Sequence, residues 1–342
     1  MIAGTAPYPR NQWYVAASLK EVESGPLHRW ILDKPVVLFQ SESGEHVALF
    51  DRCPHRGLPL SLGKVVGETI QCTYHGMRFG SDGHCAEIPS GGPISDRMCV
   101  ESFPLVQRWQ WLWIWMGDPA LADESKIPDL AQFGFGREGW HHEIGPLLPV
   151  SANYLLPFEN LLDASHISFL HHGLIDSGDV ATMPFTTETD GDWMRVIRQI
   201  ENEQVSPLTQ TTFATAAATA DRIITADAHA PNLCGIRVDL KSTDERQQGT
   251  RTNQLMVAIT PVTKDRCLQH TAICQNFPFL NENREQDVRN LLMEDVEAME
   301  SIQALLDALD PESHIEVSVH ADTPAMRMRR EIQRMLESEL RA

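Results

Sequence analysis

The chain has 342 residues, of which 28 are Lys or Arg and 47 are Asp or Glu, giving a formal net charge of −19. This acidic balance argues against nucleic acid or an anionic membrane as a partner. The length predicts two domains or one large one. The N-terminal segment has no apolar stretch like that of a signal peptide, and no apolar run approaches the roughly 18 residues of a membrane span, so a cytoplasmic protein is expected.

Seven cysteines are spread over the chain, and their odd number argues for a reducing compartment rather than a disulfide framework. Two of them, Cys53 and Cys72, belong to the metal-binding pattern described below. The others are expected to be small buried apolar residues, with Cys85 nearest to that pattern. They are Cys85, Cys99, Cys234, Cys267 and Cys274.

From Trp13 to Phe50, short apolar runs alternate with polar turns, a pattern that predicts an antiparallel all-β unit. It continues through a hairpin turn at Phe79–Gly83 to the apolar run Trp111–Met116, whose tryptophans are interpreted as core residues. Gly117-Asp118-Pro119 ends this run, so the first domain is predicted to comprise residues 1–119 and the second residues 120–342.

The sequence Gly134–Gly139 spells GxGxxG, but no apolar strand precedes it and no helical apolar period follows. It therefore lacks the βαβ context of a dinucleotide site, and the chain has no evident nicotinamide or flavin fold.

The second part of the chain mixes helical and strand-like periods. A helical period begins at Asn153, and strand-like runs follow at 193–197 and 255–260. A long amphipathic helix is predicted from Glu285 to about Ala308, and a last helix from Asp322 to Leu340. Such a mixture is typical of an α+β domain. The expected apolar face of the long helix consists of Val288, Leu291, Leu292, Val296, Met299, Ile302, Leu305 and Leu306.

Two short loops contain the first metal-binding pattern, Cys53-x-His55 and Cys72-x-x-His75. Each loop offers one thiolate and one imidazole. A structural zinc site normally clusters its ligands as Cys-x2-4-Cys or His-x3-5-His, and neither spacing occurs here. A Rieske [2Fe–2S] centre holds one iron by two thiolates and the other by two imidazoles, as these loops would allow.

A second pattern lies at Asn160, Asp163, His166 and His171. The first three recur at steps of three and would share one face of a helix. His171 is five residues beyond His166, so both imidazoles can reach one ion only if the helix loosens or ends between them. Two histidines and a carboxylate form a facial site for ferrous iron with open positions. His172 is the rival of His171 as a ligand.

Together these motifs resemble the terminal oxygenase component of the Rieske non-haem iron oxygenases, and are closest to the dicamba and vanillate O-demethylase type. The resemblance extends from Asn11–Ala16 to the last helix. It implies an α+β chain in which an all-β Rieske [2Fe–2S] domain precedes a helix-grip-like catalytic domain with a mononuclear Fe(II) site. The respiratory-type loop disulfide is absent, because Leu58 and Tyr74 stand at the corresponding positions.

The resemblance also implies roles for single residues. The cluster ligands would be Cys53, His55, Cys72 and His75. The iron ligands would be His166, His171 and Asp295, with Glu294 as the alternative to Asp295. Asp163 would bridge an iron ligand to a cluster histidine, and Asn160 would be its companion near the iron. Glu297 and Glu300 are expected on a solvated face.

The implied function is that of the oxygenase component of a multicomponent monooxygenase, using O2 and NAD(P)H through a reductase, a ferredoxin or both. The leading hypothesis is O-demethylation of a methoxylated aromatic compound with release of formaldehyde. Alternatives are ring hydroxylation or cis-dihydroxylation, N-demethylation, and a plain Rieske electron carrier. The family forms homotrimers in which one subunit's cluster serves its neighbour's iron.

The substrate pocket is predicted less sharply. Asn253, His270 and Arg251 are candidate lining residues. A histidine that binds the substrate carboxylate in the dicamba-type enzyme falls near Val257, so this acid-binding pattern does not transfer directly.

Overall fold

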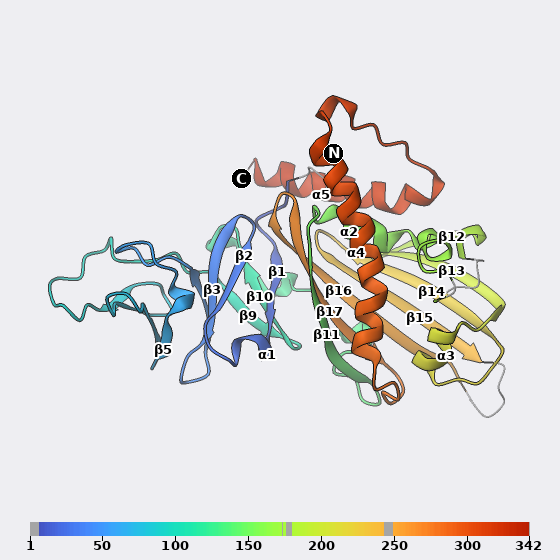
Figure 1. Cartoon of the computed structure of the whole chain (residues 1–342), viewed down its shortest axis with the longest axis horizontal. Coiled ribbons are helices and arrows are strands. Elements are labelled where there is room, and N and C mark those ends of the chain that lie inside the picture. The colour runs from blue at the N-terminus through green and yellow to red at the C-terminus, as the bar shows by residue number, and fades with distance from the viewer. Residues whose placement is uncertain (1–6, 173, 176–179, 243–248, 342) are drawn as a thin grey trace. The chain divides into compact units, whose positions relative to one another are not determined.

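A computed structural model of the chain describes residues 7–172, 174–175, 180–242 and 249–341 (Figure 1). Two compact units are present. One comprises residues 10–127, and the other comprises residues 128–341 with residues 7–9. The domain boundary drawn from the sequence at Pro119 stays a prediction.

The first unit consists mainly of small antiparallel sheets, as the alternation of apolar runs and turns predicts. A short helix, α1 (Leu19–Val22), follows its first strand. The strands in sheet order are β1 (Trp13–Ser18), β10 (Trp111–Trp115) and β9 (Leu105–Arg108); β2 (Leu27–Ile31), β3 (Lys34–Gln40) and β4 (His46–Phe50); and β5 (Lys64–Val66), β6 (Thr69–Gln71), β7 (Arg78–Phe79) and β8 (Cys85–Glu87).

Burial of apolar side chains explains why this unit is ordered around the two cysteine loops. The three tryptophans of β10 are all buried, as expected for core residues. Phe39, Leu49 and Phe79 form a further cluster that also includes Cys53 and Cys72. Both loops are therefore anchored in the hydrophobic core by their cysteines. Of the remaining cysteines, Cys99 is exposed, so the expectation that it would be buried was wrong.

The second unit is built on a seven-stranded antiparallel sheet (Figure 1). Within this sheet, the strand that comes first along the chain pairs with the strand that comes last. The strands in sheet order are β11 (His141–Val150), β17 (Arg266–Gln275), β16 (Arg251–Thr263), β15 (Leu233–Ser242), β14 (Thr219–His229), β13 (Trp193–Gln204) and β12 (Phe185–Asp190). A strand, β11, follows Gly134–Gly139, where a dinucleotide site would need a helix.

The register of the sheet aligns side chains into rows that cross five strands on one face. The row called here the apolar row consists of Val196, Ala226, Ile236, Leu255 and Ile273. The adjacent row, called the mixed row, consists of Arg198, Ile224, Val238, Asn253 and Gln275.

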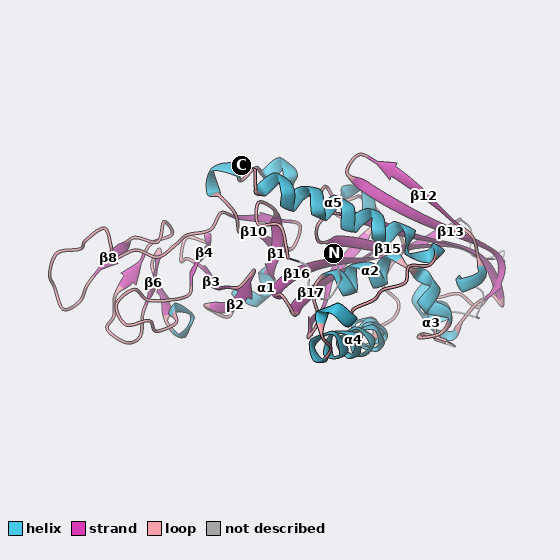
Figure 2. Cartoon of the chain, turned by 90° about the horizontal axis from the view of Figure 1, so that it is seen from above, coloured by secondary structure: helices cyan, strands magenta, loops and turns pink. Residues whose placement is uncertain are grey.

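Helices cover this face of the sheet. They include α2 (Leu155–Leu162), α3 (Pro207–Phe213) and α4 (Arg284–Ala308), and a further helix, α5 (Thr323–Glu339), packs against α2. The long helix α4 crosses in front of the strands in Figure 1, and the view from above shows it on one side of the sheet (Figure 2). Arg329 of α5 forms an ion pair with Glu159 of α2, which ties the last helix to the segment that contains the second metal-binding pattern.

The predicted limits of α4 agree with the structure to within one residue, but its apolar face is only partly buried. Leu292, Val296 and Met299 are buried as expected. Ile302 and Leu305, by contrast, are 48% and 59% exposed, so the prediction was wrong for this end of the helix. Among the described residues, none of the helices combines the length and the apolar character that a membrane span requires.

Candidate active site

Two loops with the same backbone geometry contain the first group of candidate ligands. In the loops that begin at Cys53 and Cys72, the cysteine N–H donates to the carbonyl five residues on, at 2.8 and 2.9 Å. The glycine four residues on donates back to the cysteine carbonyl, at 2.9 and 3.0 Å. These glycines, Gly57 and Gly76, have φ values of 78° and 74°, a left-handed conformation that glycine adopts without steric cost.

The side chains of the loops separate by type. Cys53 and Cys72 are buried, with their thiols adjacent. Burial raises the pKa of the Cys53 thiol, and the neighbouring Cys72 thiol adds to the shift. His55 and His75 are exposed, and their ring centroids are 4.4 Å apart. Paired thiols inside and paired imidazoles outside fit a Rieske cluster, in which each type of ligand holds one iron.

The second group of candidate ligands begins where α2 ends. The extended backbone of Asp163 (φ −108°, ψ 91°) stops the helix. Its carboxylate then accepts hydrogen bonds from the Ser165 N–H (2.9 Å) and hydroxyl (2.8 Å), which caps a 3₁₀ turn at Ala164–Ser168. The expectation that Asn160, Asp163 and His166 share one continuous helical face was therefore wrong. The expected break between His166 and His171 is present, because the turn ends at Ser168.

Two imidazoles and one carboxylate meet at a single point. Asp295 Oδ1 on α4 lies 3.1 Å from His171 Nε2 and 3.5 Å from His166 Nε2. One ligand atom from each of the three residues lies within 4.8 Å of the others. Asp295 and His171 are buried, and His166 is partly exposed. Two histidines and a carboxylate are the donor set of a non-haem ferrous site, so this group can hold a metal of that kind.

The other nitrogen of each imidazole is occupied by the protein. His171 Nδ1 contacts Glu294 Oε2 at 2.6 Å, and His166 Nδ1 bonds to the backbone carbonyl of Asp163. Both rings are thus turned so that Nε2 faces Asp295, as expected for histidines prepared to bind a metal. Glu294 lies behind the His171 ring, so the structure favours Asp295 over Glu294 as the third ligand. His172 is exposed and is not part of the group.

The electrostatic environment of the two imidazoles differs. Burial lowers the pKa of His166, against the opposing charge of Asp295. Burial acts in the same direction on His171, but hydrogen bonds and charges from Asp295 and Glu294 outweigh it and raise the pKa of His171. His171 is therefore held mainly by two carboxylates, whereas His166 is held by one carboxylate and a backbone carbonyl.

Three more polar residues surround this group. Asn160 on α2 donates from its side-chain amide to Asp295 Oδ1 at 3.2 Å, which places it beside the candidate ligands, as expected. The Asp163 carboxylate lies 3.8 Å from the guanidinium of Arg198, a buried residue that the sequence reasoning missed. Side chains along β13 alternate between more and less buried positions, and Arg198 is at one of the buried positions.

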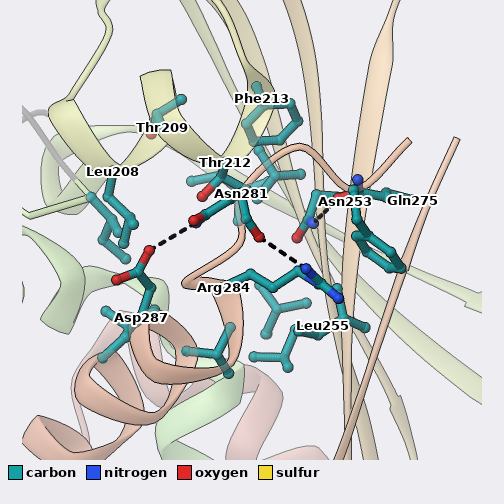
Figure 3. A pocket seen from close by; sticks show the side chains of 18 of the residues that line it. Leu208, Thr209, Thr212, Phe213, Asn253, Leu255, Gln275, Asn281, Arg284 and Asp287 are labelled. Atoms are coloured by element: carbon teal, nitrogen blue, oxygen red, sulfur yellow. Dashed lines mark hydrogen bonds between the residues drawn. The ribbon is translucent and has the colours of Figure 1, made fainter. Parts of the chain in front are cut away.

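Two adjoining cavities lie between the helices and the sheet. One, of about 80 Å³, is lined by His166, His171 and Asp295. The other, of about 160 Å³, has part of its lining drawn in Figure 3. The residues that line both cavities are all apolar: Ile167, Ile175, Ile224, Ile236, Leu255 and Leu291. The metal-binding group therefore opens onto a mainly hydrophobic space.

The three candidate pocket residues are distributed differently. Asn253 lines the larger cavity. Arg251 donates to the carbonyl of Phe213 and is not among the residues lining the two cavities. His270 lies on β17, three residues before the cavity residue Ile273. Because side chains alternate between the two faces of a strand, His270 points to the opposite face of the sheet.

Several lining residues were missed by the sequence reasoning. Gln275 ends β17, whereas Asn281, Arg284 and Asp287 come from the beginning of α4 and the segment before it, where no motif marks them.

Comparison with known proteins agrees with this geometry. Residues 12–104 match the Rieske [2Fe-2S] domain, and residues 150–338 match the vanillate O-demethylase oxygenase C-terminal domain. The second match covers more than half of the chain. The chain belongs to the Rieske oxygenase family, with a catalytic domain of the vanillate O-demethylase type.

Relatives with curated descriptions include the putative toluene-4-sulfonate monooxygenase system iron-sulfur subunit TsaM2 of Comamonas testosteroni, 41% identical over 53% of this chain and 51% of that protein. The oxygenase component of dicamba O-demethylase of Stenotrophomonas maltophilia is 41% identical over 48% of each chain. This chain thus spans about half the length of these two curated relatives.

The crystal structure of dicamba monooxygenase bound to 3,6-dichlorosalicylic acid superimposes with a TM-score of 0.88 at 28% identity, covering 98% of this chain and 99% of the other. Another crystal structure of that enzyme contains non-heme iron and dicamba. The α+β fold, with an N-terminal Rieske domain followed by a catalytic domain, is confirmed.

Proposed function

We propose that this protein is the oxygenase component of a multicomponent monooxygenase that removes the methyl group from a methoxylated aromatic compound. The observation that carries the proposal is the group His166, His171 and Asp295, which opens onto an apolar cavity in a chain that also has a Rieske domain. The reaction would consume O2, two electrons and two protons. It would yield the free hydroxyl compound, formaldehyde and water.

The geometry supports an assignment of residues to the two metal centres. The two iron centres, when bound, would supply one-electron storage and the activation of O2. The iron ligands would be His166, His171 and Asp295. The cluster ligands would be Cys53, His55, Cys72 and His75.

The remaining residues of the site would position these ligands. Glu294 would hold the His171 ring through Nδ1, and the Asp163 carbonyl would hold the His166 ring in the same way. Asn160 would fix the Asp295 carboxylate by donating to Oδ1. The apolar walls would exclude water from the reacting methyl group.

The electrons would come from a reductase, a ferredoxin or both, since Gly134–Gly139 is followed by a strand and not by the helix of a dinucleotide site. We further propose a homotrimer in which Asp163 links the iron site of one subunit to a cluster histidine of its neighbour. The Asp163 side chain is 25% exposed, and His55 and His75 are exposed, so a second copy has access to all three. The exposed apolar side chains Ile315 and Val317 are further contact candidates.

A cytoplasmic location is part of the proposal. None of the seven cysteines is joined in a disulfide, a state that a reducing compartment preserves.

The test combines purified protein, a surrogate reductase, NADH and a panel of methoxylated and N-methylated aromatic compounds. Formaldehyde released in step with NADH oxidation is the expected result. An Asp295→Ala variant should keep the cluster signal and release none. If the wild-type protein accepts electrons yet oxidises no compound in the panel, the electron-carrier alternative is preferred.

A further inference from the structure

The two cavities change in polarity with distance from the metal-binding group. The smaller cavity, which contains the histidines, is lined by Ala226, Ile236 and Leu255 of the apolar row. Asn253 and Gln275, at the end of the mixed row, line only the larger cavity. Apart from Arg198, at the other end of the mixed row, a bound molecule therefore meets apolar side chains beside the metal-binding group and amide groups farther away.

The arginines that line the cavities do not offer an unopposed positive charge. Each of them has a carboxylate within ion-pair distance. The pairs are Arg198 with Asp163 (3.8 Å), Arg222 with Glu203 (2.5 Å), and Arg284 with Glu143, which it meets through two guanidinium nitrogens. The charge of each guanidinium is thus opposed by a carboxylate, and Arg284 also has its hydrogen-bonding face occupied, so these arginines attract a further anion weakly.

Asp287 is the exception among the charged residues of the larger cavity. Its carboxylate accepts a hydrogen bond from the Asn281 side-chain amide at 2.8 Å (Figure 3). Among the described residues, no Lys, Arg or His is recorded in an ion pair with it. Asp287 is partly exposed, so the carboxylate retains some contact with water. Among the charged residues that line this cavity, Asp287 is thus the one without an ion-pair partner in the described part of the chain, and Asn253 supplies an amide nearby.

The dimensions limit the size of the ligand. The larger cavity has a volume of about 160 Å³, and an apolar protein cavity of about 150 Å³ binds a single benzene ring. The smaller cavity, of about 80 Å³, leaves room for a substituent directed at the metal-binding group.

From this arrangement, and resting on the proposed function, we propose that the substrate is a single-ring aromatic ether with a neutral or cationic hydrogen-bond donor at the far end. A hydroxyl, amide or amine N–H would donate to Asp287, while the methoxy group lies against the apolar row. An aromatic carboxylate or sulfonate would instead place its charge beside the Asp287 carboxylate, where the lining arginines are already paired with other carboxylates, and this costs binding free energy.

The test uses three compounds with the same ring and methoxy group: 4-methoxybenzylamine, 4-methoxybenzamide and 4-methoxybenzoate. Their binding to metal-replete protein is measured by calorimetry without O2 or reductase, so that no turnover is needed. Because a hydrogen bond to a charged group is stronger than one between neutral groups, the amine should bind at least about ten-fold more tightly than the benzoate. The amide should lie between them.

The Asp287→Asn variant should weaken binding of the amine by about ten-fold and strengthen binding of the benzoate. Glu285→Gln, an exposed position in the same helical turn, serves as the matched control and should change neither affinity. The ranking of the three compounds on the wild-type protein needs no variant, so a folding defect in Asp287→Asn leaves the test intact. Equal or tighter binding of the benzoate to the wild-type protein, or no binding of any of the three, overturns the inference.

A turnover assay distinguishes failure of this inference from failure of the proposed function. Formaldehyde released only from 4-methoxybenzoate would overturn the inference and leave the demethylase function standing. Tight binding of the amine through Asp287, with no oxygen-dependent product from any methoxylated compound, would support the inference on binding and overturn the proposed reaction.

Discussion

Glu294 provides a sharp test of how the iron site is organised. Its carboxylate accepts a hydrogen bond from His171 Nδ1 at 2.6 Å, so it fixes the ring with Nε2 toward Asp295. A charge-assisted bond of this kind contributes about 1.5–3 kcal/mol. The Glu294 side chain is 42% exposed, which favours the lower end of that range. Glu294→Gln keeps an acceptor and loses the charge, so we expect iron affinity to fall about ten-fold.

Competition with a chelator for the mononuclear iron measures this effect, and the EPR signal of the reduced cluster reports that the Rieske domain remains intact. Glu294→Ala removes the acceptor altogether and should weaken iron binding by up to about 100-fold. Glu297→Gln, at an exposed position on the same helix, is the control and should bind iron normally. Unchanged iron affinity in both Glu294 variants would refute the reasoning.

Three further outcomes are expected. Asp163→Asn should retain both metals, because His166 bonds to the backbone carbonyl and Asn can still cap Ser165, while formaldehyde release falls by about 100-fold; wild-type turnover would exclude the bridging role. Trp113→Ala should lower the free energy of unfolding by about 3–5 kcal/mol in urea, because Trp113 is fully buried; a loss below about 1 kcal/mol would contradict the packing of β10. Burial lowers the pKa of His229 below its usual 6.5, so its contribution to the free energy of unfolding is present above that pH. This contribution is lost by up to about 1.4 kcal/mol per pH unit as the pH falls below 6.5. His229→Gln should flatten the dependence of the free energy of unfolding on pH, and an unaltered dependence would contradict the role given to His229.

The Rieske loops and the strands of the first unit were predictable because their signals are local. The identical hydrogen-bond pattern around Cys53 and Cys72 depends on six consecutive residues in each loop, with a glycine where the backbone is left-handed. The strand Trp111–Trp115 is buried on both faces, so its unbroken apolar sequence sufficed to identify it.

The iron site was predictable only in part. The ligand spacing at His166 and His171 could be read from the sequence, but the choice between Asp295 and Glu294 depends on the rotation of α4 about its axis. That rotation is fixed by packing of Leu292 and Val296, and not by the local sequence. Likewise the capping of a new turn by Asp163 overrides the helical period that the spacing indicates.

The substrate cavity was largely beyond the sequence, because its walls come from rows of residues on different strands. Asn253 and Gln275 are neighbours only through the register of β16 and β17. His270 has a suitable side chain but lies on the other face of its strand. Ile302 and Leu305 continue the apolar period of α4 and yet are exposed. An apolar period predicts which face of a helix is apolar, but not whether another element covers that face.

The central claim is that a Rieske cluster and a mononuclear iron held by His166, His171 and Asp295 act together in oxidation of a substrate. The most direct measurement is the iron content, the EPR spectrum and the formaldehyde yield of one preparation before and after selective removal of the mononuclear iron. We predict an unchanged Rieske signal, loss of product, and recovery of product when ferrous iron is restored. A preparation with no Rieske signal on reduction, or with full activity after the mononuclear iron is removed, would contradict the account.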